Sequence, residues 1–297
     1  MINYTACITD LMQDIVRRLP ELGFIDLERV LVFARYGRSE AEGAYATCHS
    51  LNLPTSEPGY YYWRDRRTGE ITRRSEWFVT KSPVVSIRGV ALDYLISFTL
   101  PRFTHQSLEH SRKEIYYPGG EPWLAKLDTI VHELYHIDPE RPGIRRIDRS
   151  DGGCSGVSHS VSFYEEVSRL VKRYLAASPD PERYNFLRYT FEELTLIYGG
   201  VVATTFNTFP SYPQRYREAI TGSGEEPVPD VTVEPVKQPA RPRRYTEADL
   251  ELRQFFEHAL RGTVRREVVA PGWAPRQRLV TLAGARQPST AANRRRR

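Results

Sequence analysis

Two histidines four residues apart, with a glutamate directly after the first, carry the strongest chemical signal in this sequence: His132, Glu133 and His136. Residues i and i+4 of an α-helix lie one turn apart on the same face, so both imidazoles can reach one metal ion at about 2.0–2.1 Å. Glu133 projects about 100° round the same helix, a direction that suits a base acting on water better than a third ligand. The HExxH pattern is typical of zinc peptidases.

The neighbouring residues predict the helix that this spacing requires. Between residues 122 and 137 the apolar positions recur with a helical period: Trp123, Leu124, Leu127, Ile130, Val131 and Leu134. Pro122 suits the first turn and Pro139 ends the helix. Asp128 lies one turn before His132, where it either orients a histidine N–H or is a solvated surface carboxylate.

A catalytic zinc site takes a third protein ligand. The extended metzincin pattern would place a histidine six residues after His136, where this chain has Pro142, so that class is excluded. We favour His159, because it opens a second amphipathic helix whose apolar residues follow at helical spacing from Phe163 to Tyr174. The alternatives are Glu165 or Glu166 on that helix and Asp151 in the preceding loop.

Stabilisation of a developing oxyanion requires a further donor, and the sequence leaves four candidates open. They are Tyr164, Tyr135, Arg145 and Arg146. The loop 138–156 between the two ligand helices is rich in charge and glycine, and we expect it to form a rim of the substrate site.

Charge is concentrated at the end of the chain. Residues 261–297 contain ten arginines and one glutamate, so this tail carries 10 − 1 = +9, and the remainder of the +5 chain carries 5 − 9 = −4. The tail could contact nucleic acid or serve as a solvated, disordered extension. Three widely spaced cysteines form neither a disulfide framework nor a zinc ribbon, which points to the cytoplasm. No apolar stretch is long enough for a transmembrane helix, and the N-terminus does not read as a signal peptide.

The sequence predicts an α+β fold, a zincin-like core in which a small, mainly antiparallel sheet packs on the HExxH helix and a second ligand-bearing helix. Helices are expected at residues 1–22 and 90–100 and, within the segment 181–199, at 186–194; strands are expected at 29–35, 43–53, 77–79, 84–87 and 201–206. We divide the chain into a catalytic domain (1–220), a Pro-rich linker (221–245), a short docking helix (246–262) and the basic, disordered tail (263–297).

The residues 126–137, followed by His159-Ser160 and Phe163-Tyr164, resemble the phage-type metallopeptidases among the SprT-like and WLM-like minimal zincins. That resemblance implies a compact helix–sheet–helix core with HExxH and a histidine at the start of a later helix. SprT proteins that act at DNA commonly carry a cysteine zinc ribbon, which this chain lacks. A role in DNA repair is therefore not implied.

These features predict an intracellular zinc-dependent metallopeptidase with one zinc ion per chain. Three neutral histidines would bind the metal, and Glu133 would act as general base on a zinc-activated water that attacks a peptide bond. The alternative is a non-catalytic, zinc-stabilised binding protein that recruits nucleic acid or a protein partner through residues 246–297. No membrane contact is expected.

Overall fold

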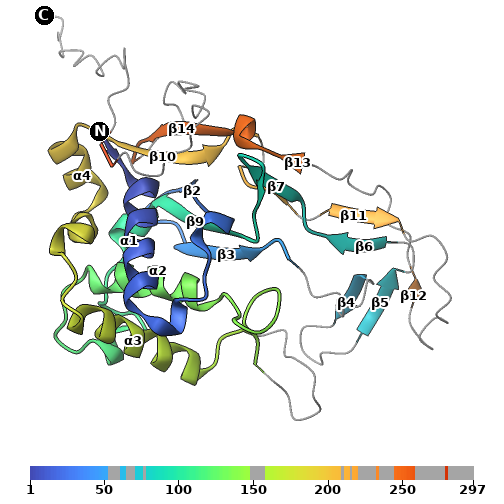
Figure 1. The fold of residues 1–297 in the computed structure, drawn as a ribbon, viewed down its shortest axis with the longest axis horizontal. Coiled ribbons are helices and arrows are strands. Elements are labelled where there is room, and N and C mark those ends of the chain that lie inside the picture. The colour runs from blue at the N-terminus through green and yellow to red at the C-terminus, as the bar shows by residue number, and fades with distance from the viewer. Residues whose placement is uncertain are drawn as a thin grey trace, which may run out of the picture.

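The fold comes from a computed structural model, which describes residues 1–52, 61–64, 71–75, 78–147, 158–208, 211–214, 216–219, 232–233, 244–257 and 278–279. Four α-helices lie in this part: α1 (Tyr4–Arg18), α2 (Leu124–Tyr135), α3 (Val161–Ala176) and α4 (Phe191–Tyr198). The helices gather on one side of the strands, and the short strands β4, β5, β6, β11 and β12 lie at the far end (Figure 1).

The strands are short. They are β1 (Ile2–Asn3), β2 (Val30–Gly37), β3 (Ala46–Ser50), β4 (Tyr61–Arg64), β5 (Ile71–Ser75), β6 (Phe78–Lys81), β7 (Val84–Ile87), β8 (Val90–Ala91), β9 (Tyr94–Pro101), β10 (Val201–Phe206), β11 (Tyr216–Ala219), β12 (Thr232–Val233), β13 (Arg244–Tyr245) and β14 (Leu250–Phe255). Parallel and antiparallel pairs occur together in these small sheets, so the prediction of a mainly antiparallel sheet is wrong.

The sheet β2–β9–β3 is the support of the site. β9 lies in its centre, parallel to β2 and antiparallel to β3, and every residue of β9 is buried. The helix predicted at 90–100 is therefore wrong. Because both faces of β9 are covered, apolar residues occur at odd and even positions alike. The alternation of apolar and polar residues that marks a half-buried strand is therefore missing.

A second sheet, β1–β10–β14, lies beside β2 and, like the first sheet, contributes residues to both apolar clusters of the domain. Phe33 of β2 meets Phe206 of β10 edge to face, with ring centroids 5.1 Å apart. Leu31, Leu95 and Leu250 belong to the same apolar cluster. The two sheets thus share this apolar layer on one side, and on the other side α1 packs against both β2 and β10.

The segment predicted as a docking helix at 246–262 is a strand over its described part. Leu250–Phe255 pairs antiparallel with β10 along its whole length. Leu250 packs into one apolar cluster and Phe255 into another, which fits opposite faces of a strand. The segment does dock onto the domain, but through backbone pairing with β10, a strand that would otherwise be an open edge.

The helical side forms the larger core. The side chain of Asn3 caps α1 by accepting from the Ala6 N–H, and Ile8, Leu11 and Ile15 pack in the cluster that also holds the apolar stripe of α2. Several predicted elements are confirmed: the N-terminal helix as α1, the metal helix as α2, the next helix as α3, and strands β2, β3, β6, β7 and β10.

In the C-terminal part of the chain, the predicted elements agree only partly with the observed ones. The helix expected within 181–199 begins only at Phe191, after two 3-10 turns at Pro181–Arg183 and Asn185–Arg188. Most of the predicted linker and tail lies outside the described residues. Where they are described, Tyr245 at the end of the linker packs in the apolar layer, and Arg278 in the tail accepts a backbone hydrogen bond from Asn3 at 2.8 Å.

Candidate metal centre

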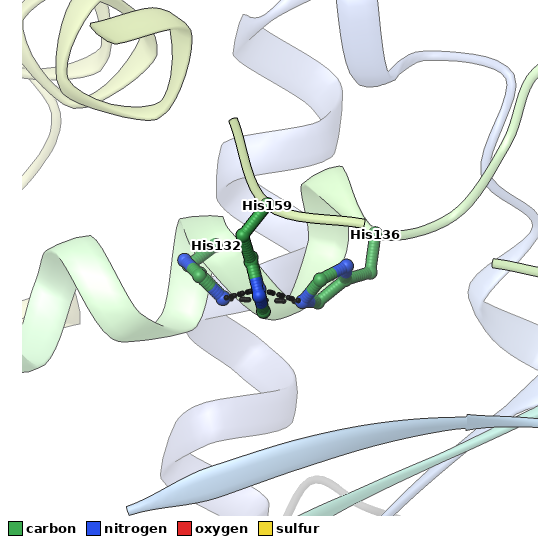
Figure 2. A group of neighbouring side chains, drawn as sticks. All are labelled: His132, His136 and His159. Atoms are coloured by element: carbon green, nitrogen blue, oxygen red, sulfur yellow. Dashed lines mark hydrogen bonds between the residues drawn. The ribbon is translucent and has the colours of Figure 1, made fainter. Parts of the chain in front are cut away.

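Three histidines converge on one point beside α2. The Nε2 atoms of His132 and His136 are 3.1 Å apart, and Nε2 of His159 is 3.0 Å from each. Figure 2 shows the three rings pointing toward one another from α2 and from the segment leading into α3. These separations are short enough for one ion to contact all three nitrogens at about 2.0–2.1 Å. The three residues can hold a metal ion, as the spacing predicts.

Local sequence explains how the ligands are held. His136 is the C-cap of α2 and has helical backbone angles, so the i, i+4 relation to His132 is kept. Ser160 caps α3 by accepting from the Phe163 N–H at 3.1 Å, which places His159 just before the helix. The Phe163 ring packs against all three imidazoles, with centroid distances of 4.9–5.1 Å. A residue predicted only as core therefore also supports the ligands.

The histidines are kept neutral. Burial, followed by the charges of His136 and Lys113, lowers the pKa of His132 to about 2, and burial with His159 lowers that of His136 to about 3. The pKa of His159 is also lowered by burial and by Arg112. A ring nitrogen is either a donor or an acceptor, so hydrogen bonds cannot close a triangle of three such atoms. A cation accepts all three lone pairs at once, and neutral imidazole is its ligand form.

Glu133 is buried at the edge of the same cluster. Its Oε2 has no hydrogen-bond partner among the described residues. Burial raises the pKa of Glu133 to about 8, and a hydrogen bond from the Cys48 backbone and the charges of Lys113 and Arg35 offset part of that rise. A buried carboxylate oxygen without a partner is costly, so it marks a position where a proton or a ligand is handled.

A cavity of about 660 Å³ opens over these residues. Its walls come from α2, from the edge strand β3 with the residues before it, from the loop 106–113, and from the start of α3. Glu133 and all three histidines line it. The metal cluster is thus accessible from one side and supported by protein on the others.

Tyr164 is the one predicted oxyanion donor that lines the cavity within the described part of the chain. Its ring stacks on His159 with centroids 5.5 Å apart and planes 15° apart, and its hydroxyl accepts a hydrogen bond from the Arg112 guanidinium. Arg112 also lies over the Tyr164 ring and lines the cavity. The sequence analysis missed Arg112, because no short-range pattern connects it to the metal helix.

The other predicted donors lie elsewhere. The Arg145 guanidinium donates to the carbonyl oxygens of Tyr135, at 2.8 Å, and Ile137, at 3.3 Å. It also lies 4.2 Å above the Tyr135 ring. Arg145 therefore closes the C-terminal end of α2, where a cation is favourable. Neither Tyr135, Arg145 nor Arg146 belongs to the described lining of the cavity.

Asp128 is not a surface carboxylate, and among the described residues it contacts a tyrosine and a lysine rather than a histidine. It is buried, accepts from the Tyr117 hydroxyl at 2.7 Å, and pairs with the Lys113 ammonium at 2.9 Å. Lys113 also donates to the Ala125 carbonyl and to Thr129. Both expectations for Asp128, a group that orients a histidine and a solvated surface carboxylate, are therefore wrong. Asp128 neutralises the buried Lys113 in the cavity wall, a residue for which no role was predicted.

Neither glutamate considered as an alternative third ligand joins the cluster. Glu166 pairs with Arg169 at 2.9 Å, which lowers the pKa of Glu166, and Glu165 is exposed on α3. Asp151 lies outside the described residues. Among the earlier histidines, His110 is exposed beside Glu109, whereas His105 belongs to a separate group with two glutamates.

Among the described helices, none combines the length and apolar character needed to cross a membrane. No family model, no curated protein and no solved structure matches this chain, so its function has to be inferred from the chemistry of the site.

Proposed function

We propose that this protein is a zinc-dependent peptidase, with His132, His136 and His159 as metal ligands and Glu133 as general base. The observation that carries the proposal is the convergence of three imidazole nitrogens, 3.0–3.1 Å apart, beside a buried glutamate in the wall of one cavity. A structural zinc site takes four protein ligands and needs no base. Three ligands with Glu133 beside them favour hydrolysis over a non-catalytic binding protein.

The ligand set suits zinc. Three neutral nitrogen donors on one side, with a cavity on the other, are the arrangement of a catalytic zinc site with an open position. When bound, zinc lowers the pKa of a water molecule and polarises a carbonyl group. Because the imidazoles carry no charge, they leave the full charge of the ion available for this purpose.

Glu133 has a free oxygen for proton transfer. Oε2 is not committed to another group, while the Cys48 backbone holds the carboxylate from β3. The side chain can therefore take a proton from the attacking water and return it to the leaving amine without breaking its own support. Burial raises the pKa of Glu133 to about 8, and the positive charge of a bound zinc ion would favour the ionised carboxylate that accepts the proton.

An extended peptide fits beside β3. The Thr99 N–H donates to the Tyr45 carbonyl and the Leu51 N–H to the Asp93 carbonyl, so the odd residues of this strand bond to β9. In an antiparallel pair the alternate residues, Ala46 and Cys48, then direct their backbone groups away from β9. Both residues line the cavity. Because the Cys48 backbone already holds Glu133, a substrate strand could pair with this edge at Ala46 and pass its carbonyl across the metal cluster.

Arg112 is the candidate donor to the developing oxyanion. Its guanidinium is held over the cavity by the Tyr164 hydroxyl and ring, and Tyr164 in turn stacks on His159. A cation in the wall of the same cavity can stabilise negative charge on the substrate oxygen. Arg112 supplies the charge and Tyr164 fixes its position.

We place the peptidase in the cytoplasm. Cys7 and Cys48 are free thiols in the described structure, and Cys48 lines the cavity itself. Free thiols are the norm in a reducing compartment. The phage-type, SprT-like and WLM-like zincins are the families whose expected core this site resembles, and they supply the proposed class of activity.

The test compares Glu133→Gln with the parent for zinc content and for hydrolysis of a fluorogenic peptide library. We expect the variant to keep one zinc ion at the three histidines and to lose turnover by about 10²–10⁴-fold, the usual contribution of a general base. Glu165→Gln, the same change at an exposed position of α3, is the control and should leave both unchanged. Turnover in a zinc-loaded Glu133→Gln protein would contradict the proposed role.

A further inference from the structure

A second group of metal-binding side chains lies where three distant segments meet. His105 ends the 3-10 turn after β9, Glu192 lies in the first turn of α4, and Glu257 follows β14. Nε2 of His105 is 3.4 Å from Oε2 of Glu257 and 3.5 Å from Oε2 of Glu192. The three ligand atoms all lie within 4.8 Å of one another. None of these residues belongs to the described lining of the 660 Å³ cavity.

One long hydrogen bond, between His105 Nε2 and Glu257 Oε2 at 3.4 Å, does not account for the second carboxylate at Glu192. An imidazole nitrogen carries at most one hydrogen, which can point at one carboxylate, yet two carboxylate oxygens face the same Nε2. Both distances exceed the roughly 2.7–2.9 Å of a charge-assisted hydrogen bond. They equal the ligand–ligand separation of about 3.4 Å expected around a tetrahedral ion with ligands at about 2.0–2.2 Å.

Charge leads to the same conclusion. Within the described part of the chain, the recorded ion pairs of Glu192 and Glu257 are with His105 alone. Two carboxylates that converge on one imidazole repel each other, and a divalent cation between them removes that repulsion. Glu192 is exposed, so an ion can enter from solvent.

The ligands are supported from behind. Oε1 of Glu257 accepts a hydrogen bond from the Ser39 hydroxyl, which leaves Oε2 to face His105. Glu192 stands in the first turn of α4, which Thr190 and Glu193 cap reciprocally. Gln106, the residue after His105, hydrogen-bonds to Thr129 on α2. The three positions are thus set by β14, α4 and the wall of the catalytic cavity.

We propose that His105, Glu192 and Glu257 bind a second divalent metal ion with a structural role. One imidazole nitrogen and two carboxylate oxygens suit a borderline ion such as Zn²⁺. The ion joins the end of β14 and the start of α4 to the turn after β9. It thereby secures the end of the C-terminal strand β14.

The test is the zinc content of the full-length protein after loading with Zn²⁺ and removal of excess metal by gel filtration. We expect about two equivalents per chain in the parent and about one in Glu257→Gln and in Glu192→Gln. Glu192→Gln removes a charge from an exposed side chain, so it should not disturb folding. Glu182→Gln, an exposed glutamate on another turn, is the matched control and should keep two. Two equivalents in both site variants would overturn the proposal.

We expect each metal site to lose its zinc ion independently of the other. His159→Ala should lose one equivalent, and His159→Ala with Glu257→Gln should lose both. The parent could instead bind only one equivalent of zinc. If Glu257→Gln loses that zinc and His159→Ala keeps it, the catalytic site is refuted and the structural site stands. If His159→Ala loses it and Glu257→Gln keeps it, the structural site is refuted. As a second measurement, EDTA should lower the thermal midpoint of His159→Ala but leave that of the double variant unchanged. An equal response to EDTA in both proteins would also contradict the structural ion.

Discussion

The two histidine-containing clusters are assembled from different kinds of sequence. His132 and His136 come from one turn of α2, and His159 precedes the next helix, so short-range periodicity brings the donors together. His105, Glu192 and Glu257 come from segments that only the folded sheets bring into contact. The first cluster can therefore be recognised from sequence, whereas the second becomes visible only in three dimensions.

Their surroundings differ as much as their origins. The three-histidine cluster borders a cavity of about 660 Å³ and has the uncommitted Oε2 of Glu133 beside it. In the second cluster both carboxylates face the imidazole, and none of its residues belongs to the described lining of that cavity. Chemistry requires a group that is not already engaged as a ligand, while a structural clamp requires only convergence. This difference separates the expected consequences of losing each site.

The largest expected effect is the loss of activity when a ligand of the three-histidine cluster is removed. His159→Ala should lower kcat/KM for peptide hydrolysis by about three orders of magnitude, since the metal supplies several kcal/mol of transition-state stabilisation. His105→Asn should leave kcat/KM within about threefold, because His105 does not belong to the described lining of the catalytic cavity. Both are measured on zinc-loaded protein under the same conditions. Equal losses in the two variants would mean that the clusters act as one unit.

A smaller effect tests what surrounds the catalytic cluster. Arg112→Met should lower kcat/KM by about 10- to 100-fold with zinc content unchanged, since one donor to the oxyanion is lost from an exposed side chain. Tyr164→Phe keeps the ring on His159 and removes only the hydroxyl that positions Arg112, so its loss should be smaller. Arg141→Met is the control for removing an exposed arginine. If Tyr164→Phe lost more activity than Arg112→Met, the hydroxyl itself would be the donor.

Sequence reasoning succeeded where a single element determines the outcome. The helical period of Trp123 to Leu134 predicts α2, and the same period after Phe163 predicts α3 and the position of His159 before it. Burial of both stripes in one core then aligns the two helices. The metal-binding geometry follows from these two helices.

The same reasoning failed where tertiary context decides. β9 is covered on both faces and therefore lacks strand alternation, and the spacing of Leu250 to Phe255 imitates a helix although the segment pairs with β10. Arg112 and Lys113 lie in a polar stretch with no motif, and Asp128 pairs with Lys113 rather than with a histidine. Such contacts depend on where a loop crosses a helix, and the spacing of apolar residues in the sequence does not predict this.

The smallest expected effect concerns the helix that carries the catalytic cluster. Lys126 is buried on α2 and donates to the Tyr189 carbonyl at 2.8 Å. Burial lowers the pKa of Lys126 from 10.5 to about 8, with Glu193 opposing the shift. Between these two pH values the unfolded chain binds a proton that the folded chain does not, so the free energy of unfolding should rise with pH across this window.

Lys126→Met removes that dependence. From pH 8 to 10.5 the parent should gain about 2–3 kcal/mol of unfolding free energy relative to the variant, as the pKa difference requires. Below pH 8 the lysine is charged in both states, and the difference should become constant. Denaturant unfolding of both proteins across this range measures it, and taking the difference cancels the titration of the tyrosines. Parallel curves would show that Lys126 keeps its charge in the folded protein, with the Tyr189 carbonyl and Glu193 compensating for its burial.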